Sequence, residues 1–356
     1  MPQHDSPHVS VIILNWNTWR DTVECIESLY HNAYKNFTVL LVDNNSTDDS
    51  REQLLDWFSG KSKKTITTQF PDSVYPVRNK PVKVRSITIE QGEIKQEESG
   101  KPKEDEGAII MLLNDHNAGF AKANNIAIRY VLKYLHSSYI YILNNDTVID
   151  KNALRTLIAF MEENNTTGAA TSTIYQYDNP QQIAIAGGTI TPWAKVVHYQ
   201  DKVSENMRKV RFVSGCALLV RTQVFSKYGV LSERFYYGEE DIEFSLRMNR
   251  LNIDMVCLYT SIVFHKVSRS AQQYFSSRAV KVYLNALNRL INMKQFFSPL
   301  KWYTWRLFVL MYFFYLFKKH HVSSKRALGY IFEIYRLSNE LDRVDKATVE
   351  SILLKD

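Results

Sequence analysis

Residues 139–150 read Tyr-Ile-Tyr-Ile-Leu-Asn-Asn-Asp-Thr-Val-Ile-Asp, and the fold can be argued outward from this stretch. Its first five residues are aromatic, β-branched or aliphatic, which is typical of a strand buried on both faces. The run then breaks into Asn144-Asn145-Asp146, so a carboxylate stands at the carboxyl end of a buried strand. Ligands bind at that edge of open α/β sheets, and a hard divalent cation takes oxygen ligands. The tripeptide alone is also ordinary turn chemistry, so neighbouring stretches must decide between a ligand site and a turn.

Three earlier stretches repeat the pattern of an apolar run followed by a polar loop and then apolar residues at helical spacing. The apolar runs are Val9 to Leu14, Phe37 to Val42 and Ala108 to Leu113. With the strand at 139–143 they give four strand and helix pairs within the first 165 residues. This alternation predicts an α/β fold with a mainly parallel central sheet flanked by helices.

The later part of the sheet region contributes three further predictions. A long buried strand is expected from Arg211 to Arg221, where Gly215 indicates close approach of a ligand or of backbone. A helix is expected after Gly238, with several acids in its first turn, a placement that the helix macrodipole favours by itself. A short strand ends at His265, and a lone histidine is more often structural than a ligand.

Composition indicates a globular protein of 356 residues with net charge +7. Residues 1–270 are expected to form the sheet domain, with residues 59–107 as a surface insertion that contains a β-hairpin built on Val82 to Ile89. Residues 271–356 are expected to be helical. The three scattered cysteines and a polar N-terminus without an apolar core favour a cytoplasmic protein.

The C-terminal region is basic and aromatic, with no Asp or Glu between Phe297 and Phe332. Its most apolar part, Trp302 to Phe317, is short for a membrane span and contains Arg306. Two interpretations stay open. The helix packs on the catalytic domain, or residues 299–326 lie in the plane of an anionic membrane surface, which would make the protein peripheral on the inner membrane face.

Taken together, these stretches resemble the family 2 glycosyltransferases with a GT-A fold, most closely the rhamnosyltransferase-like branch. The resemblance covers about 9–58 and 108–268, and it gives no support to the insertion or the C-terminal region. The motifs that carry it are Val9-Ser-Val-Ile-Ile-Leu-Asn-Trp-Asn17, Leu41-Val-Asp-Asn-Asn-Ser-Thr-Asp48, Asn117-Ala-Gly-Phe-Ala121 with Asn124-Asn125, Leu143-Asn-Asn-Asp-Thr147 and Tyr237-Gly-Glu-Glu-Asp-Ile-Glu-Phe-Ser-Leu-Arg247.

The resemblance implies a nucleoside-diphosphate sugar as donor, with its base against Leu14, Asn15, Trp16 and Asn44. The full set of implied donor-binding residues is Leu14, Asn15, Trp16, Asn17, Asp43, Asn44, Gly119, Phe120, Asn125 and Asn145. Asp146 takes the position of the acid that binds Mn²⁺ or Mg²⁺, and His265 is the best candidate for a second metal ligand. Because the family motif often has more than one acid, metal binding here is expected to depend on the diphosphate as well.

The resemblance also implies an inverting transfer in which Asp241 is the general base of a Glu240-Asp241 acid pair. The acceptor is expected to be the hydroxyl of a glycan or of a lipid-linked sugar. A position at a helix start is expected to lower the pKa of Asp241. The pair Glu239-Glu240 is an alternative register, although the downstream Phe-Ser-Leu-Arg favours Asp241.

Other function classes fit less well. A nucleotidyltransferase would carry a glycine-rich loop after the first strand, and a dehydrogenase would carry G-x-G-x-x-G, whereas Asn15-Trp-Asn-Thr18 contains no glycine. No nucleic acid partner is expected. The remaining alternative is a catalytically inactive module that binds sugar nucleotides or glycans. The branch resemblance tilts the donor towards a deoxythymidine or uridine nucleotide.

Overall fold

The computed structural model describes residues 6–96, 108–266 and 277–354. Its strands are β1 (Val9–Asn15), β2 (Phe37–Asp43), β3 (Val84–Glu90), β4 (Glu93–Gln96), β5 (Ile109–Asn114), β6 (Tyr139–Asn144), β7 (Thr147–Ile149), β8 (Thr167–Gln176), β9 (Ile183–Ile185), β10 (Gly188–Ile190), β11 (Val196–His198), β12 (Met207–Val210), β13 (Ala217–Arg221) and β14 (Asp254–His265). Its helices are α1 (Trp19–Tyr30), α2 (Ser50–Ser59), α3 (Pro71–Val74), α4 (Phe120–Tyr134), α5 (Ala153–Glu163), α6 (Thr222–Tyr228), α7 (Glu240–Arg250), α9 (Arg278–Met293), α10 (Pro299–Lys319), α11 (Ser324–Glu340) and α12 (Lys346–Leu353).

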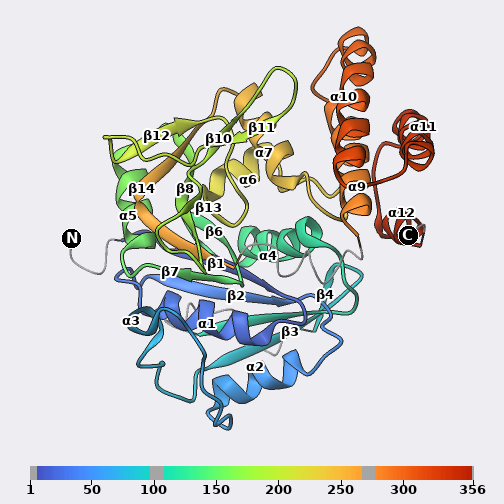
Figure 1. Ribbon diagram of the computed structural model, residues 1–356. Coiled ribbons are helices and arrows are strands. Elements are labelled where there is room, and N and C mark those ends of the chain that lie inside the picture. The colour runs from blue at the N-terminus through green and yellow to red at the C-terminus, as the bar shows by residue number, and fades with distance from the viewer. Residues whose placement is uncertain (1–5, 97–107, 267–276, 355–356) are drawn as a thin grey trace.

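One large mixed sheet forms the centre of the molecule (Figure 1), in the order β12-β14-β8-β13-β6-β1-β2-β5-β3-β4. Strand β1 pairs in parallel with β2 and β6, and β2 pairs in parallel with β5. The register sets Asn15 opposite Asp43 and Leu14 opposite Asn144, so these strands end at one edge. The predicted α/β architecture with a mainly parallel sheet is therefore confirmed.

Helices cover both faces of the sheet, because alternate side chains of each buried strand enter different cores. Ile12 packs in a core with residues of α4, α6 and α7. Val11 and Ile13 point to the other face, where α1, α2 and α5 complete a second core. Figure 1 shows α2 below the sheet and α4 above it.

The described part of the insertion, residues 59–96, contributes to this sheet. β3 and β4 form an antiparallel hairpin around Gln91 and Gly92, both at positive φ, and β3 pairs in parallel with β5. Strand β3 corresponds to the hairpin strand expected at Val82 to Ile89. It extends the central sheet, whereas the sequence suggested a purely surface element. Residues 97–107 of the expected insertion lie outside the described residues.

The single long strand expected from Arg211 to Arg221 was wrong. β12 ends at Val210 and β13 begins at Ala217, and residues 211–216 connect them. The backbone amides of Arg211 and Phe212 donate to Gly188 O, and Ser214 Oγ accepts from the amide of Cys216. These bonds turn the chain out of the ladder just before β13.

The C-terminal helices α9 to α12 pack around a third core (Figure 1, right). α9 begins after Ser277, whose side chain accepts from the amide of Val280 and caps the helix. Residues 271–276 of the expected helical region lie outside the described residues. Within the part of the chain that the structure describes, no helix combines the length and apolar character needed to cross a bilayer.

Candidate active site

A cleft of about 190 Å³ opens at the carboxyl ends of β1, β2 and β6. Seven of the predicted site residues line it: Leu14, Trp16, Asn44, Gly119, Phe120, Asn145 and Asp146. Tyr236 and Tyr237, which directly precede the acids of α7, complete the wall. The cleft therefore combines three strand ends with the segment that leads into α7.

Asn44 builds the floor of the cleft and fixes the loop before α4. Its Nδ2 donates to Asn117 Oδ1 at 2.9 Å, and its Oδ1 accepts from the amide of Ala118 at 3.0 Å and from Asn114. These bonds hold the Asn44 amide in place and use only one of the two N–H groups of its Nδ2. Gly119 adopts φ +80°, and a Cβ there would lie 2.4 Å from Tyr236 O. Only glycine fits at this position.

Four residues expected to bind the donor do not line the cleft. Asn15 donates to Asp43 and Ser46 and accepts from Thr22, while Asp43 is bonded by Arg51 at 2.9 Å. Asn125 exchanges two bonds with the backbone of Leu231. Asn17 bonds to Thr47. Position at a strand end was inferred correctly, but these side chains turn inward or sideways and brace loops. The assignment of Asn15, Asn17, Asp43 and Asn125 to donor binding stays a prediction.

The two predicted metal ligands lie together. His265 Nε2 is 3.0 Å from Asp146 Oδ1, and both side chains are nearly buried. Burial opposes ionisation of Asp146, but His265 holds the pKa of that carboxyl below its usual value. Burial likewise opposes protonation of His265, yet Cys216 and Asp146 raise the pKa of the imidazole well above its usual value.

The residues around Asp146 fit a divalent cation. Asn144 Oδ1 is buried, has no hydrogen-bond partner among the described residues, and belongs to a side chain that lines the cleft beside Asp146. A carboxylate and an amide oxygen are donors that Mg²⁺ and Mn²⁺ accept. No cluster of three or more His, Cys, Asp or Glu able to hold a metal occurs within the described residues.

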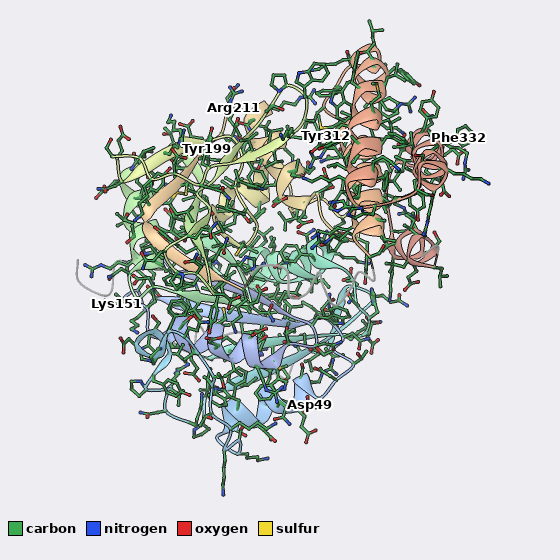
Figure 2. All side chains as sticks on the ribbon, in the orientation of Figure 1. Asp49, Lys151, Tyr199, Arg211, Tyr312 and Phe332 are labelled. Atoms are coloured by element: carbon green, nitrogen blue, oxygen red, sulfur yellow. The ribbon has the colours of Figure 1, made fainter. Side chains whose placement is uncertain are left out.

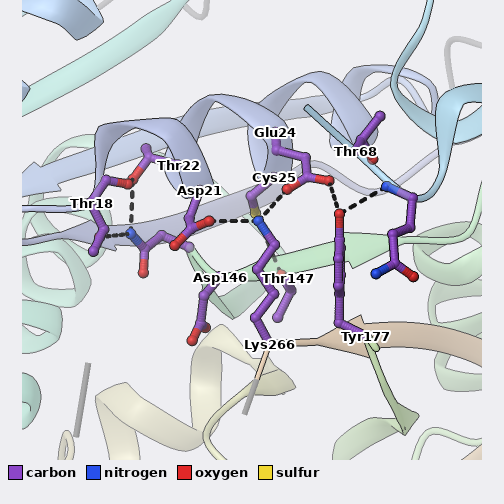
Figure 3. A network of polar contacts seen from close by, with 12 residues as sticks. Thr18, Asp21, Thr22, Glu24, Cys25, Thr68, Asp146, Thr147, Tyr177 and Lys266 are labelled. Carbon is purple, nitrogen blue, oxygen red and sulfur yellow. Dashed lines mark hydrogen bonds and ion pairs between the residues drawn. The ribbon is translucent and has the colours of Figure 1, made fainter. Parts of the chain in front are cut away.

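A buried ion network, missed from the sequence, supports this pair (Figure 3). Lys266 Nζ lies 2.5 Å from Asp21 Oδ1 and also contacts Glu24, and both acids belong to α1. Tyr177 donates to Glu24 at 2.7 Å, and the amide of Lys266 donates to Asp146 O at 3.0 Å. The network fixes the end of β14 beside α1. Its sequence signal was the spacing of Asp21 and Glu24 on one face of α1.

The acids at the start of α7 are partly buried. Loss of hydration and the negative charge of the neighbouring Asp241 raise the pKa of Glu240 to about 8. Loss of hydration and the negative charge of Glu239 raise the pKa of Asp241 to about 6. The expected lowering at the helix start was wrong, because these effects outweigh the backbone amides of Ile242 and Gly215. A carboxyl with a pKa near 6 is still mostly ionised at neutral pH.

The Gly215-Cys216 dipeptide links the metal pair to the acid pair. A Cβ on Gly215 would lie 3.9 Å from Asp241 Cβ and 3.8 Å from Phe120, which is ordinary contact with side chains, so the close approach of neighbouring backbone expected at Gly215 is not seen among the described residues. On the other side, Cys216 interacts with His265, and Cys216 O accepts from the amide of Asn144 at 2.8 Å. Asp146 and Asp241 therefore lie on two sides of one short connection.

Comparison with solved structures defines the class of the fold. The chain is similar to GalNAc-T7, solved with UDP, GalNAc and Mn²⁺, at 13% identity and TM-score 0.52, over 81% of this chain and 51% of that one. It is also similar to the mannosyltransferase PcManGT from Pyrobaculum calidifontis, solved with GDP-Man and Mn²⁺, at 12% identity and TM-score 0.51, over 99% and 80%. The fold is that of GT-A glycosyltransferases.

Sequence comparison gives the family. The model of glycosyl transferase family 2 matches residues 10–70 and 96–229, more than half of the chain, and the protein belongs to this family. A curated relative is the low-salt glycan biosynthesis hexosyltransferase Agl10 of Haloferax volcanii, 26% identical over 183 residues, or 51% of this chain. The match spans 59% of that relative's length. The resemblance to family 2 found in the motifs is confirmed.

Proposed function

We propose that this protein is an inverting, metal-dependent hexosyltransferase that uses a nucleoside-diphosphate sugar and a glycan or lipid-linked acceptor. The observation that carries the proposal is the single cleft that joins Asp146 to Tyr236 and Tyr237, next to the acid pair of α7. The relatives support the donor and the cation in general terms, because two solved neighbours contain a nucleotide or nucleotide sugar together with Mn²⁺.

The donor would occupy the cleft with its base between Leu14 and Trp16 and its diphosphate towards Asp146. Apolar and aromatic walls suit a base, which offers two flat faces. Asp146, His265 and the amide oxygen of Asn144 would hold the cation. When bound, the cation offsets the negative charge that grows on the departing diphosphate.

The chemistry assigned to this chain is proton removal from the acceptor. Asp241 accepts the proton of the acceptor hydroxyl while the hydroxyl oxygen forms a bond to the anomeric carbon. The bond from that carbon to the diphosphate oxygen breaks on the opposite face, and the nucleoside diphosphate leaves with the electron pair. The configuration inverts, and Asp241 then releases its proton to water. Glu240, the other member of the acid pair, lies next to Asp241, and its carboxylate opposes a second negative charge there.

The test is the isosteric change Asp241→Asn. Nucleoside diphosphate release from UDP-glucose, UDP-N-acetylglucosamine, dTDP-rhamnose and GDP-mannose is measured with Mn²⁺, and the best donor is then used throughout. The variant should lose ~10²–10⁴-fold in turnover and keep its affinity for the nucleoside diphosphate. Asp254→Asn, an exposed acid, is the control. Binding without release by the wild type would favour the inactive module, and full turnover by Asp241→Asn would contradict its role as base.

We also propose that the acceptor is carried on an anionic membrane that the C-terminal helices contact. Tyr312 on α10 and Phe332 on α11 are 48% and 71% exposed (Figure 2). Further exposed apolar residues of α10 are Leu300, Tyr303, Leu307, Phe308, Met311 and Tyr315. Exposed cations of the same helices are Lys301, Lys318, Lys319, Lys325 and Arg326. Apolar and cationic side chains together suit the interface of a lipid surface that carries negative charge.

Arg306 does not belong to this surface, although the sequence grouped it with the basic residues there. It is 1% exposed, donates to Asn339 Oδ1 at 2.6 Å, and stacks over Trp302 and Tyr335 at 4.2 and 4.0 Å. α10 therefore packs one face on α11 through a buried guanidinium and leaves the other face exposed. The proposed surface contact would therefore use only the exposed face of α10.

A further inference from the structure

The acid segment, defined here as residues 234–241, is attached to the C-terminal region at several points between Arg234 and Glu239. The amide of Tyr236 donates to Val344 O, and the amide of Val344 donates to Arg234 O, both at 2.8 Å. Asn288 of α9 donates to Tyr237 O at 2.7 Å. Tyr236 and Tyr237 also pack against the core of α9 to α12. The C-terminal region thus fixes the backbone that enters the catalytic helix.

The contact nearest to the acids is made by Glu239, which sits immediately before Glu240 and Asp241. Glu239 caps α7 in the left-handed conformation at φ +70°, which is costly for a residue other than glycine. Its carboxylate turns away from the acid pair towards α9. Arg289 Nε donates to both of its oxygens at 2.9 and 3.0 Å, and Asn292 Nδ2 donates to Oε2 at 2.9 Å.

Arg289 also ties this contact to a third element. Its NH1 group donates to Ala194 O in the loop between β10 and β11, and Trp305 of α10 donates to Trp193 O in the same loop at 2.8 Å. The guanidinium is nearly surrounded by protein, so the Glu239 and Arg289 charges depend on each other. Removing one partner of such a pair leaves an uncompensated charge beside the catalytic acids.

From this geometry we infer that Arg289 and Asn292 are positioning residues for the transfer reaction, acting through Glu239 to hold Asp241 in line with the acceptor. The inference rests on the proposed role of Asp241 as base. The hydrogen bonds from α9 hold Glu239 in its strained left-handed conformation, and Arg289 supplies the positive charge that offsets the Glu239 carboxylate. The C-terminal helices are thereby part of the active site, although none of their residues lines the cleft.

The charges that act on Asp241 give a readout that a purely structural role would not move. Among the described residues these are Glu239 and Glu240 from its own segment and Arg289 from α9. Glu239 raises the pKa of Asp241 and Arg289 lowers it. Turnover should fall as pH drops through the pKa of Asp241, because the protonated base accepts no proton. This fall on the low-pH side of the pH profile is called the acid limb below. Arg289→Ala should move this acid limb to higher pH, and Glu239→Gln should move it to lower pH.

The experiment measures kcat, KM and the acid limb for four variants with the best donor and Mn²⁺. Arg289→Ala should lose ~10²-fold in kcat with little change in donor KM, since a small misplacement of the base has that effect. Arg289→Lys keeps the charge, and Asn292→Ala removes a neutral donor, so both should lower kcat without moving the acid limb. Arg336→Ala, which breaks an exposed pair with Glu340 on α11, is the matched control and should behave as wild type.

Failure of this inference is distinguishable from failure of the proposed function. If Asp241→Asn abolishes turnover while Arg289→Ala keeps wild-type kcat and acid limb, the positioning role is overturned. Acid limbs that move in the same direction in Arg289→Ala and Glu239→Gln overturn it as well. Full turnover by Asp241→Asn would instead overturn the assignment of the base. If Arg289→Ala does not fold, Asn292→Ala and Glu239→Gln still decide, with circular dichroism and UDP binding as checks of the fold.

Discussion

At the scale of single residues, polar side chains at strand ends have two different roles. Some face the cleft, and others form hydrogen bonds that hold neighbouring loops. Asn144 and Asn145 are neighbours at the end of β6, yet Asn144 Oδ1 is unpartnered among the described residues while Asn145 Nδ2 donates to Thr18 and Thr22. An orphaned buried oxygen costs free energy unless a ligand satisfies it. That cost is the local evidence for a cation beside Asp146.

Lys266 gives the first prediction at this scale. Lys266→Met keeps most of the stem but leaves Asp21 and Glu24 without their cation. Both acids are nearly buried, so the free energy of unfolding should fall by ~3–5 kcal/mol. Lys209→Met breaks an exposed pair with Asp254 and should cost ~0–1 kcal/mol. Urea unfolding measures both variants, and equal losses would contradict the network. Adding Glu24→Gln to Lys266→Met should recover part of the loss.

Side-chain direction is what the sequence left undetermined at this scale. Apolar runs followed by polar loops predicted the strand ends, and Leu14, Trp16 and Asp146 line the cleft as expected. Asn15 and Asn125 occupy equally suggestive positions but face the interior. The raised pKa of Asp241 was also unforeseen, because it depends on hydration and on Glu239, whereas the sequence shows only a helix start.

At the scale of elements, α10 has one buried face and one exposed face. Trp302, Trp305 and Phe317 are buried against its neighbours, while Leu307 and Met311 are 58% and 69% exposed. The apolar character of this helix is spread around its circumference, so the sequence predicted neither face. Its buried side explains why it stands beside α11, and its exposed side is the basis of the membrane proposal.

The corresponding prediction concerns vesicle binding. The double variant Leu307→Ser and Met311→Ser should abolish co-sedimentation with vesicles that contain phosphatidylglycerol, because it removes apolar area without touching the packed face. Lys318→Glu with Lys319→Glu should weaken binding in a salt-dependent way. Leu55→Ser, at an exposed apolar residue of α2, should have no effect. Unchanged binding by the α10 variants, or equal binding to uncharged vesicles, would reject the proposed surface.

At the scale of the whole molecule, the sequence predicted the sheet and the C-terminal helices as elements. It did not predict how the helices contact the sheet region. Each has a regular hydrophobic period, which short stretches of sequence reveal. The contact between Arg289 and Glu239 joins residues fifty positions apart, and an arginine on an amphipathic helix looks like any surface cation. Such pairs are visible only once the helices are placed against the sheet.

Ligand binding provides the prediction for the molecule as a whole. Because the described residues hold no cluster of three or more acidic, histidine or cysteine ligands, Mn²⁺ alone should raise Tm little, while UDP, dTDP or GDP with Mn²⁺ should raise it more than either separately. A ligand at a hundred times its Kd stabilises by ~2.7 kcal/mol. Asp146→Asn should remove the increment due to Mn²⁺ and keep that of the nucleotide alone. If Asp146→Asn keeps the rise in Tm due to Mn²⁺, the cation binds elsewhere.

The C-terminal contacts of the acid segment limit where this chain can be joined to a relative in a chimaera. These contacts are the bonds between Val344 and residues 234–236 and those from α9 to Glu239. One way to build a chimaera of this scaffold is to exchange its C-terminal helices with those of a relative. In this molecule a graft that begins after the sheet would separate Glu239 from Arg289 and Asn292. A functional hybrid should therefore take its junction upstream of Arg234, so that the helix start and its supports are inherited from the same parent.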